Sequence, residues 1–320
     1  MGAEPHALVV GTGSIGRRHL RNLAALGVGR LSAYDADPDR LAFARDDLGA
    51  DGHDSLEAAL GAGPDVVLVC TPPVSHVETA LAAIGVSADV FVEKPLASSL
   101  DGVDGLLDAA TRSGRVVQVG YNLQFEPALE RVKELIDGGA IGRVVWARAE
   151  FGQYLPDWRP WQDYRRSYTA RRELGGGIVL DASHELAYVM WLLGTPVEVR
   201  AMGGTVGALE VDVEDSATVL MRFADGAQAD VHVDFLQRQP VRQLKAVGVD
   251  GTILLDLLSG ELSVLPDGES ELFTPDDDLA YRAELSHFLD CVRTRAKPRV
   301  DLAFGRDVLA VAVGALEQLA

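Results

Sequence analysis

Short apolar runs alternate with amphipathic stretches from Ala7 to about Gly120. The runs read ALVVG, RLSAYD, DVVLVC, DVFVE and RVVQVG, and stretches such as IGRRHLRNLAAL and SHVETALAAIG separate them. Near-continuous apolar strands that alternate with helices are typical of a parallel sheet covered on both faces. The pattern therefore predicts an α/β domain with a doubly wound parallel sheet over residues 1–122.

The pattern changes after Asn122. A helical stretch, EPALERVKELIDGG, is followed by a strand, RVVWARAEFGQ, a long polar and aromatic loop, another helix and several longer strands. A last helix is predicted from about Leu302 to Leu319. Residues 123–320 are therefore expected to form a second, α+β domain with a large, mostly antiparallel open sheet.

The segment AQADVHVDF predicts a strand with one packed and one wet face. Its small and apolar residues alternate with Asp230, His232 and Asp234, which is the period of a half-buried strand. The Asp225-Gly226 pair before it predicts a hairpin turn. As alternate residues of a wet face, the three polar residues are interpreted as solvated or as buried in an oligomer contact, and we predict no metal site.

Composition limits the class of partner. The chain carries a formal charge of -19 and a pI of about 4.7, which repels nucleic acid. No apolar run approaches the ~18 residues of a membrane helix, and the first residues lack an apolar signal core. The two cysteines, Cys70 and Cys291, form no disulfide framework or zinc motif. We therefore expect a cytoplasmic protein that binds a small molecule.

Gly11, Gly13 and Gly16 form a G-x-G-x-x-G motif between a predicted strand and a predicted helix. The first glycine of such a motif permits a tight turn, the second lets the backbone approach a pyrophosphate, and the third allows close packing. Asp35 closes the next strand, where a carboxylate accepts hydrogen bonds from ribose hydroxyls. The context favours a dinucleotide-binding Rossmann domain over a glycine-rich turn without a ligand.

Asp35 also bears on the choice of dinucleotide. Its charge repels a 2′-phosphate, and residues 36–39 contain no arginine, so NAD is preferred. Arg17 and Arg18 keep NADP as the less favoured alternative, since a guanidinium group near the loop would bind a phosphate.

Two loops after apolar strands are candidates for the nicotinamide end of the site. VCTPPVSH is either a proline-stiffened helix start or a loop along the cofactor, because open α/β sheets bind ligands at the carboxyl ends of their strands. Lys94 ends another strand and is one of four lysines, with Lys133, Lys245 and Lys297. A lysine amine trades a proton far more readily than a guanidinium group. Lys94 is thus either a catalytic group or a strand-end lysine paired with Glu93.

A second candidate group lies in LGGGIVLDASHELAYVMWLLG. In a single helix, Asp181, His184, Tyr188 and Trp191 form one stripe, at spacings of three, four and three residues. A carboxylate and an imidazole then share a face, as an acid-base pair requires. The alternative is a structural histidine without a chemical role.

Several segments together resemble a known family. GTGSIGRRH, CTPPVSH, VEKPL, GYNLQFEPAL and GGGIVLDASHELAYVMWLLG follow one another as in the glucose-fructose oxidoreductase and inositol dehydrogenase family, Gfo/Idh/MocA. AEFGQYLPDWRPWQDYRRSYTARRELGGG further resembles a branch associated with nucleotide-linked or surface-polysaccharide sugars. The resemblance implies a Rossmann domain, bound NAD(P), and oxidation or reduction of a sugar or cyclitol hydroxyl.

By this resemblance, Lys94 contacts the reacting oxygen, and Asp181 and His184 complete the acid-base group. The implied cofactor-binding residues are Gly11, Gly13, Ser14, Ile15, Gly16, Asp35, Thr71, Pro72, His76, Glu93, Lys94 and Asn122. These roles require that two stretches ninety positions apart in the sequence converge on one hydroxyl above the nicotinamide.

The chain departs from the family pattern at three places. Most members have the aspartate four residues before the histidine, whereas Asp181 lies three before His184. Ala187 stands where many members have another aspartate, which would raise the pKa of the histidine and fix its tautomer. Gln124 and Glu126 replace a basic residue and a histidine of the matching branch. These departures leave the substrate and the direction of the reaction open.

The loop from Phe151 to Leu174 is the candidate substrate clamp. Its charged residues are Arg159, Arg165, Arg166, Arg171 and Arg172 against Asp157, Asp163 and Glu173. This excess of positive charge, with stacking aromatic rings, would bind a phosphorylated or nucleotide-linked sugar. The residues assigned to substrate binding are Trp158, Tyr164, Arg165 and Tyr168. An equal alternative is an inter-subunit arm whose arginines pair with acidic neighbours.

The sequence thus predicts an NAD-dependent oxidoreductase that acts on a secondary hydroxyl or keto carbon of a nucleotide-linked or phosphorylated sugar. The alternatives are a cyclitol dehydrogenase and a catalytically idle dinucleotide-binding sensor or assembly subunit. Ala187, which stands where many family members have an aspartate, is the feature that supports the idle protein. We also expect a homo-oligomer, a dimer or a tetramer, that forms through the open sheet.

Overall fold

The structure is a computed structural model that describes residues 5–207, 209–266, 268–274, 276 and 278–319 of the 320-residue chain. Contacts divide the chain into two compact units. The first unit comprises Met1–Asn122 and Asp278–Arg306, and the second comprises Leu123–Asp277 and Asp307–Ala320. The first border between these two units lies between Asn122 and Leu123. Residues 278–306, however, were expected in the second domain and pack within the first unit.

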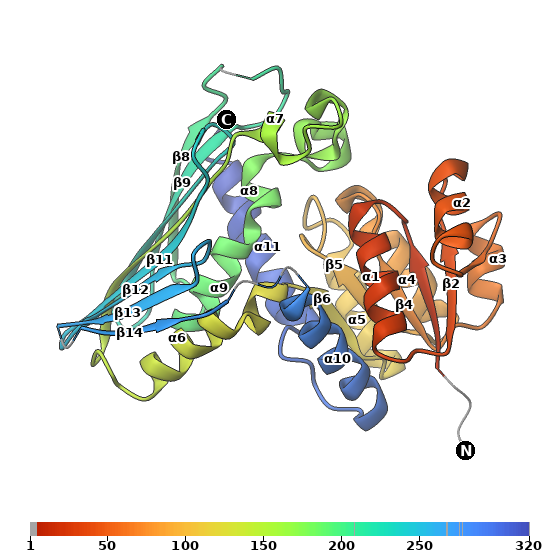
Figure 1. Ribbon diagram of the computed structural model, residues 1–320, viewed down its shortest axis with the longest axis horizontal. Helices are drawn as coiled ribbons and strands as arrows, with labels where there is room; N and C mark the ends of the chain where they lie inside the picture. Colours follow the sequence, from red (N-terminus) through yellow and green to blue (C-terminus); the bar gives the residue numbers. More distant parts are fainter. Residues whose placement is uncertain (1–4, 208, 267, 275, 277, 320) are drawn as a thin grey trace. The chain divides into compact units, whose positions relative to one another are not determined.

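The first unit is built on a six-stranded parallel sheet with the order β3-β2-β1-β4-β5-β6 (Figure 1). The strands are β1 (His6–Val10), β2 (Arg30–Tyr34), β3 (Asp51–Gly52), β4 (Val66–Val69), β5 (Asp89–Glu93) and β6 (Val117–Gly120). The helices are α1 (Ser14–Ala25), α2 (Pro38–Asp46), α3 (Leu56–Gly61), η1 (Pro73–Ser75), α4 (His76–Gly85), α5 (Val103–Ser113) and α10 (Leu279–Thr294). The order is that of a dinucleotide-binding sheet, which confirms the predicted α/β class.

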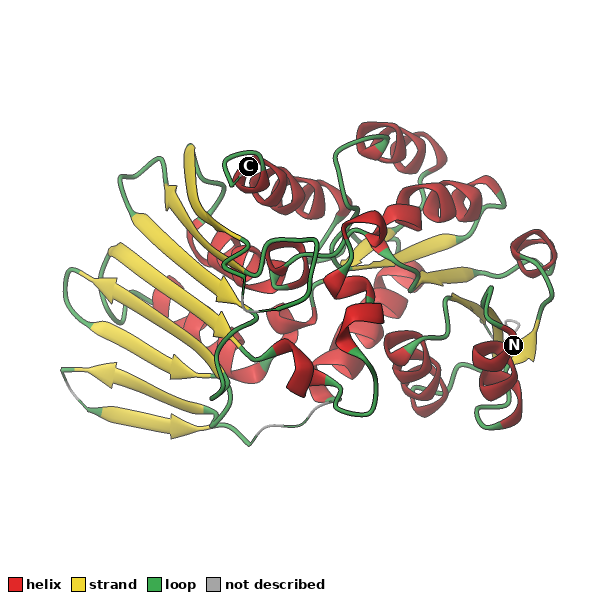
Figure 2. Cartoon of the chain, turned by 90° about the horizontal axis from the view of Figure 1, so that it is seen from above, coloured by secondary structure: helices red, strands yellow, loops and turns green. Residues whose placement is uncertain are grey.

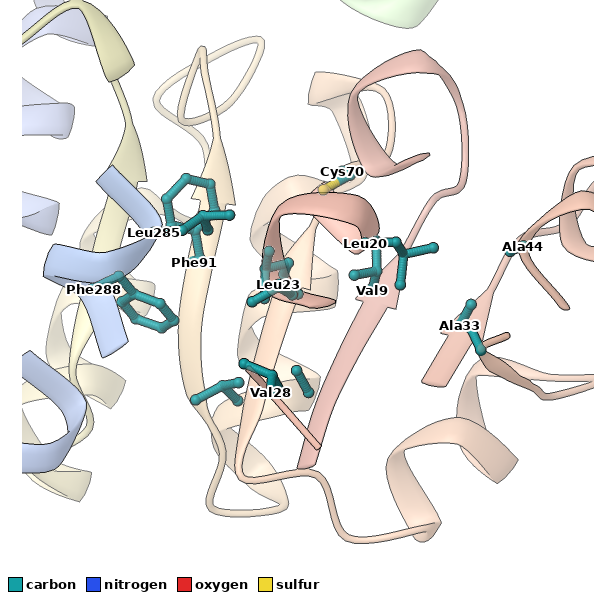
Figure 3. Close-up of a cluster of buried hydrophobic side chains, with 14 of the residues drawn as sticks. Val9, Leu20, Leu23, Val28, Ala33, Ala44, Cys70, Phe91, Leu285 and Phe288 are labelled. Atoms are coloured by element: carbon teal, nitrogen blue, oxygen red, sulfur yellow. The ribbon is translucent and has the colours of Figure 1, made fainter. Parts of the chain in front are cut away.

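Residues 278–306 belong to the first unit because α10 completes its core. Phe288 of α10 packs in the same buried cluster as Phe91 of β5 (Figure 3), and their rings meet edge to face at 5.7 Å. Just after this helix, Arg295 donates hydrogen bonds of 2.8 and 2.7 Å to the carboxylate of Asp89. These two partners lie 206 positions apart in the sequence, so no local pattern predicts the pairing.

The second unit is built on an eight-stranded sheet with the order β14-β13-β12-β11-β7-β10-β9-β8. The strands are β7 (Val144–Gly152), β8 (Glu198–Gly204), β9 (Ser216–Arg222), β10 (Gln228–Asp234), β11 (Val241–Gly248), β12 (Thr252–Asp256), β13 (Glu261–Leu265) and β14 (Glu269–Leu272). Neighbouring strands are antiparallel except β7 and β10. The predicted mostly antiparallel sheet is therefore confirmed.

Helices pack against one face of this sheet, which Figure 2 shows as one broad layer of strands. α9 (Ser183–Leu193) lies against β7 and β10, and α8 (Ile178–Asp181) lies against β9 and β10. The other helices are α6 (Pro127–Asp137), α7 (Leu155–Trp158), η2 (Asn122–Phe125), η3 (Tyr164–Arg166), η4 (Tyr168–Ala170), η5 (Arg172–Leu174) and α11 (Leu302–Leu316), which contains the last border between the units. Within the described residues, no helix combines the length and the apolar character needed to span a membrane.

Strand β10 forms the predicted hairpin with β9, but its outer face is not wet. Asp230 is only 7% exposed, because its carboxylate accepts hydrogen bonds from Trp146 and Arg148 of β7, at 3.0 and 2.6 Å. Asp234 is 3% exposed and lies 3.1 Å from Nε2 of His232, whose pKa it raises. The prediction of a solvated face is wrong for the two aspartates, since donors in the protein have replaced their water.

Candidate active site

The loop between β1 and α1 has the geometry of a dinucleotide-binding turn. Gly11 has a φ of +92°, and a Cβ there would stand 2.6 Å from the carbonyl oxygen of Cys70. A Cβ at Gly16 would collide with the Gly11 carbonyl, whereas a Cβ at Gly13 would meet nothing within 4 Å. Packing within the chain thus requires two of the glycines. The open space at Gly13 fits a pyrophosphate that approaches the backbone at the start of a helix.

Asp35, just after β2, is fixed beside this loop. Its carboxylate accepts hydrogen bonds from the backbone N–H and the hydroxyl of Thr12, at 2.6 and 3.2 Å, and from the N–H of Asp37 at 2.8 Å. A carboxylate held at this position fits the ribose hydroxyls of NAD. Ser14 and Ile15, the first residues of α1, would hold the pyrophosphate of the bound dinucleotide.

Arg17 and Arg18, which would favour NADP if they bound its 2′-phosphate, have partners within the chain. Arg17 donates a hydrogen bond of 2.9 Å to the carbonyl of Thr12, and its guanidinium carbon lies 3.9 Å from the centre of the Phe43 ring. Arg18 forms an ion pair of 3.1 Å with Asp278. Because both guanidinium groups are engaged in these contacts, the arrangement favours NAD.

Three loops lie side by side at one edge of the parallel sheet. They begin at Gly11, at Cys70 and at Lys94, directly after the adjacent strands β1, β4 and β5. The predicted residues Thr71 and Pro72 belong to the middle loop, and Asn122 follows the next strand, β6. Ligands bind at this edge in open parallel sheets, at the point where the strand order reverses. The structure therefore brings the predicted cofactor residues of the first unit to one edge.

The ring of His76 is turned into the protein. The residue is 1% exposed, and its Nε2 and Nδ1 lie 2.7 and 2.9 Å from the carbonyl oxygens of Thr71 and Pro95. Its two ring nitrogens therefore face backbone carbonyls of the chain, and the assignment of His76 to cofactor binding stays a prediction. Burial lowers the pKa of His76 against the opposing effect of these carbonyls and of Glu93. A neutral ring has one N–H, so it donates to one carbonyl at a time.

Glu93 connects α1 with the backbone of Lys94. One carboxylate oxygen lies 2.6 Å from Nε2 of His19, and the other accepts a hydrogen bond of 3.1 Å from the N–H of Lys94. His19 is fully buried, and Glu93 is 6% exposed. The Lys94 side chain is half-buried. The sequence signal for His19 is its place three residues after the third motif glycine, on the inner face of α1.

In the second unit, Asp181 and His184 do not lie on one helix. α8 ends at Asp181, Ala182 has φ and ψ of -92° and +26°, and α9 begins at the next residue. The predicted single stripe is therefore wrong. The Asp181 carboxylate is held by the preceding loop instead, accepting hydrogen bonds from the hydroxyls of Tyr168 and Thr169 at 2.6 and 2.9 Å. Asp181 and His184 are each 8% exposed.

Glu214 fixes the start of α8 and was not predicted. Its carbonyl accepts the N–H of Ile178 at 3.2 Å, and its carboxylate accepts the N–H of Val179 at 3.1 Å. Gly177 has a φ of +114°, and a Cβ there would collide with this carboxylate. Burial raises the pKa of Glu214. The sequence signal was Gly177, the third glycine of the GGG run. A glycine at such a position indicates that another group of the protein lies close to the backbone, but it does not show which group.

A buried ion pair lies next to His184 on α9. Glu185 is fully buried, and Arg242 of β11 reaches one of its carboxylate oxygens with Nε and Nη2, both at 2.8 Å. Glu185 and burial together raise the pKa of Tyr188, which is one helical turn further along. The two charged partners are 57 positions apart, so sequence patterns did not identify the pair.

The side chains assigned to substrate binding all have partners within the second unit. Trp158 donates to the carbonyl of Gln153, the Tyr164 hydroxyl accepts the N–H of Glu210, Arg165 bonds Asp163 and Glu210, and Tyr168 bonds Asp181. A small hollow lies beside them, lined by Leu155, Trp158, Arg159, Tyr164 and Thr169 among others. If these four residues bind a substrate, they do so with side chains that are also hydrogen-bonded to other groups of the chain.

Two of the five arginines of this loop, Arg165 and Arg171, form ion pairs within the chain. Arg171 pairs with Glu173 at 3.0 Å, and Arg172 bonds the carboxylate and the carbonyl of Asp212 through its N–H and its guanidinium group. Glu210 and Asp212 come from outside the loop, so counting charges within it overstated the patch. These pairings lie within one chain, so the choice between a substrate clamp and an inter-subunit arm stays a prediction.

These features define a class of protein. A Rossmann sheet with a fitting glycine loop and a fixed ribose-side carboxylate is an NAD-binding domain, and the second unit adds a large open sheet. The model of the oxidoreductase family with an NAD-binding Rossmann fold matches residues 6–121, and the model of the GFO/IDH/MocA C-terminal domain matches residues 129–254. The chain belongs to the GFO/IDH/MocA family of oxidoreductases, as the resemblance indicated.

Relatives cover almost the whole chain. It is 28% identical to the myo-inositol 2-dehydrogenase of Thermotoga maritima over 333 residues, 97% of this chain and 95% of the relative. It is 31% identical to inositol 2-dehydrogenase 3 of Saccharopolyspora erythraea over 77% of this chain and 72% of the relative. It is 26% identical to the UDP-N-acetylglucosamine 3-dehydrogenase of Acidithiobacillus ferrooxidans over 95% and 94%. A solved structure of an enzyme of that name and organism shares the fold, with a TM-score of 0.83 at 24% identity over 98% and 97%.

Proposed function

We propose that this oxidoreductase transfers hydride between NAD and a secondary hydroxyl or keto carbon of a sugar or cyclitol. The observation that carries the proposal is the place of Lys94, directly after β5 and beside the loops that follow β1 and β4. An amine at the ligand-binding edge of the sheet can exchange a proton with the reacting oxygen. Bound NAD supplies the hydride acceptor or donor.

The residues of the chain would handle the proton. During oxidation of an alcohol, the carbon loses a hydride and the oxygen loses a proton, which Lys94 would accept; during reduction, Lys94 would return it. We propose His184 and Asp181 as the other acid-base residues. The hydroxyls of Tyr168 and Thr169 support this role for Asp181, because they hold its carboxylate in one orientation.

Two substrate classes have support from different observations. A nucleotide-linked sugar is favoured by the aromatic loop and by the UDP-N-acetylglucosamine 3-dehydrogenase among the relatives. A cyclitol is favoured by the inositol dehydrogenases among the relatives. It is also favoured by the ion pairs of Arg165 and Arg171, because a guanidinium group bonded to a carboxylate offers less charge to a phosphate.

A substrate series tests the proposal. Purified protein with NAD is mixed in turn with UDP-N-acetylglucosamine, glucose and myo-inositol, and NADH formation is followed by fluorescence. We expect turnover with at least one of them, and the ranking of rates decides the class. Binding of NADH without turnover in any mixture would contradict the proposal and favour an idle dinucleotide-binding protein.

We also propose that the outer face of the eight-stranded sheet pairs with a second copy of the chain. Met202, Leu220 and Leu254 are 78%, 51% and 37% exposed, and the strand register places Leu220 and Leu254 in one row across the sheet. The same register sets the charged residues Asp230, Arg148 and Lys245 between the two leucines. A broad sheet face that mixes exposed apolar and charged side chains is a suitable surface for a subunit contact.

Light scattering coupled to gel filtration measures this assembly. We expect a dimer or tetramer for the wild-type chain and a smaller species for Leu220→Glu, which replaces an exposed apolar side chain of this face by a charged one. Leu100→Glu is the control, because Leu100 is 39% exposed and lies in the first unit. A monomeric wild-type protein would refute the proposed pairing.

A further inference from the structure

His76 joins two loops at the candidate ligand edge of the first unit. Its ring lies between the carbonyl of Thr71, after β4, and the carbonyl of Pro95, the residue after Lys94. The distances of 2.7 and 2.9 Å are those of hydrogen bonds. Because the residue is 1% exposed, its ring contacts these backbones and is closed to a ligand. Its effect on chemistry must therefore act through the loops.

A second buried side chain, that of Glu93, also binds the backbone at Lys94. The Glu93 carboxylate accepts the N–H of Lys94 at 3.1 Å, and its second oxygen lies 2.6 Å from the fully buried ring of His19. The N–H of Lys94 is thus bound by a buried carboxylate, and the carbonyl of Pro95 shares the single ring N–H of His76 with the carbonyl of Thr71. Two anchors on adjacent residues fix the direction in which the Lys94 side chain leaves the backbone.

We propose that His19, Glu93 and His76, together the lysine clamp, are positioning residues that fix the Lys94–Pro95 backbone and so aim the amine of Lys94. A lysine has a long and flexible side chain, and a misplacement of about 1 Å can cost about 100-fold in rate. The catalytic part of this inference rests on the proposed function of Lys94. The structural part, the order of the loop, can be measured without any substrate.

A second buried histidine in the same unit provides a matched control. His6, at the start of β1, is 4% exposed, and its Nε2 lies 2.8 Å from the hydroxyl of Ser32. It is nearly as buried as His76, and one of its ring nitrogens has a hydrogen-bond partner, but it lies at the opposite, amino-terminal edge of the parallel strands. Replacing either ring by phenylalanine removes a buried hydrogen bond and adds the same increase in ring size at both sites, so the two variants are matched. Only His76→Phe should loosen the Lys94 loop.

Hydrogen–deuterium exchange of the full chain, without NAD or substrate, tests the structural part. We expect the amides of residues 94–99 to exchange about tenfold faster in His76→Phe, and no faster in His6→Phe. His76→Gln should limit the change to about threefold, because the amide of glutamine carries two N–H groups for the two carbonyls. Unchanged exchange in His76→Phe, or equal acceleration in His6→Phe, would overturn the clamp.

Glu93→Gln is an independent variant in case His76→Phe does not fold. A neutral amide is a weaker acceptor for the N–H of Lys94 and for His19 than a carboxylate, so exchange of residues 94–99 should again rise. Normal exchange in a folded Glu93→Gln protein would count against the clamp, since one of its two anchors would then have no effect on the loop.

Turnover separates this inference from the proposed function. With a substrate found in the series, we expect His76→Phe to lower kcat at least about tenfold while the Kd of NADH stays within about threefold, and His76→Gln to recover most of the loss. Unimpaired turnover in Lys94→Ala would refute the role of Lys94 and leave the exchange result standing. A loss of kcat in His76→Phe that His6→Phe reproduces would refute the clamp alone.

Discussion

The two units hold their candidate site residues by different kinds of contact. In the first unit, side chains hold the main chain: Asp35 binds the N–H of Thr12, and Glu93 binds the N–H of Lys94. In the second unit, the candidate residue Asp181 is held by another side chain, the hydroxyl of Tyr168, and only the start of its helix is held through the main chain, by Glu214. The first site therefore depends on exact backbone paths after strands, and the second depends on pairs of polar groups brought together by the fold.

The largest expected effect tests whether both units serve one reaction. Lys94→Ala should lower kcat by about 10²- to 10⁴-fold, the usual contribution of an acid-base group, with NADH affinity nearly unchanged. His184→Ala should lower kcat as well. If both residues act on the same proton, the double variant should be little worse than the slower single variant. Multiplied losses in steady-state kinetics would show independent roles.

Loss of a buried carboxylate should destabilise the second unit more than the first. Glu185→Ala leaves Arg242, with a side chain 22% exposed, without its buried partner, and we expect a loss of about 3–5 kcal/mol in the free energy of unfolding. Asp89→Ala leaves Arg295, which is 50% exposed and can be hydrated, so about 2 kcal/mol is expected. Urea unfolding of both variants measures the difference, and the reverse order would contradict this account.

The glycine loop tests whether the candidate site of the first unit depends on the path of the backbone. Gly16→Ala should cost about 3 kcal/mol of stability, because its Cβ would collide with the carbonyl of Gly11. Gly13→Ala should leave stability nearly unchanged, since Gly13 has a φ of -65° and nothing within 4 Å of its Cβ position. It should instead weaken NADH binding by about tenfold, if the open space admits the pyrophosphate. Thermal melts and fluorescence titration separate the two effects.

A dependence of stability on pH is expected from Glu284 of α10. It is fully buried, neither carboxyl oxygen has a hydrogen-bond partner among the described residues, and burial with the nearby charge of Glu93 raises its pKa well above 4.5. The folded protein thus keeps a proton that the unfolded chain loses above pH 4.5. Stability should fall with rising pH by up to about 1.4 kcal/mol per unit from this group.

Glu284→Gln removes that titration and keeps the shape of the side chain. Unfolding curves at several pH values between 5 and 8 should therefore show a flatter dependence of stability on pH for the variant than for the wild-type chain. If stability depended on pH equally in the variant and in the wild-type chain, Glu284 would have the same pKa in the folded and unfolded states.

Local patterns predicted a large part of the molecule, for identifiable reasons. The hairpin at Asp225-Gly226 and the glycine turn at Gly11 form as expected, because each depends on conformations available within a few residues. The same patterns failed at α8, where the Asp181 carboxylate bonds a loop and the chain turns at Ala182. Helical spacing alone could not reveal that the stripe is interrupted.

The sequence by itself determined the order of strands and helices, the glycine loop, the charged end of β2 and the family, since period and spacing are properties of neighbouring residues. Only the tertiary structure decided which buried groups meet. It paired Asp89 with Arg295 across 206 positions and Glu185 with Arg242 across 57, and it enclosed the ring of His76 between the carbonyls of Thr71 and Pro95. Such contacts depend on how whole elements pack, because a buried charge or ring must find its partner wherever the fold supplies one.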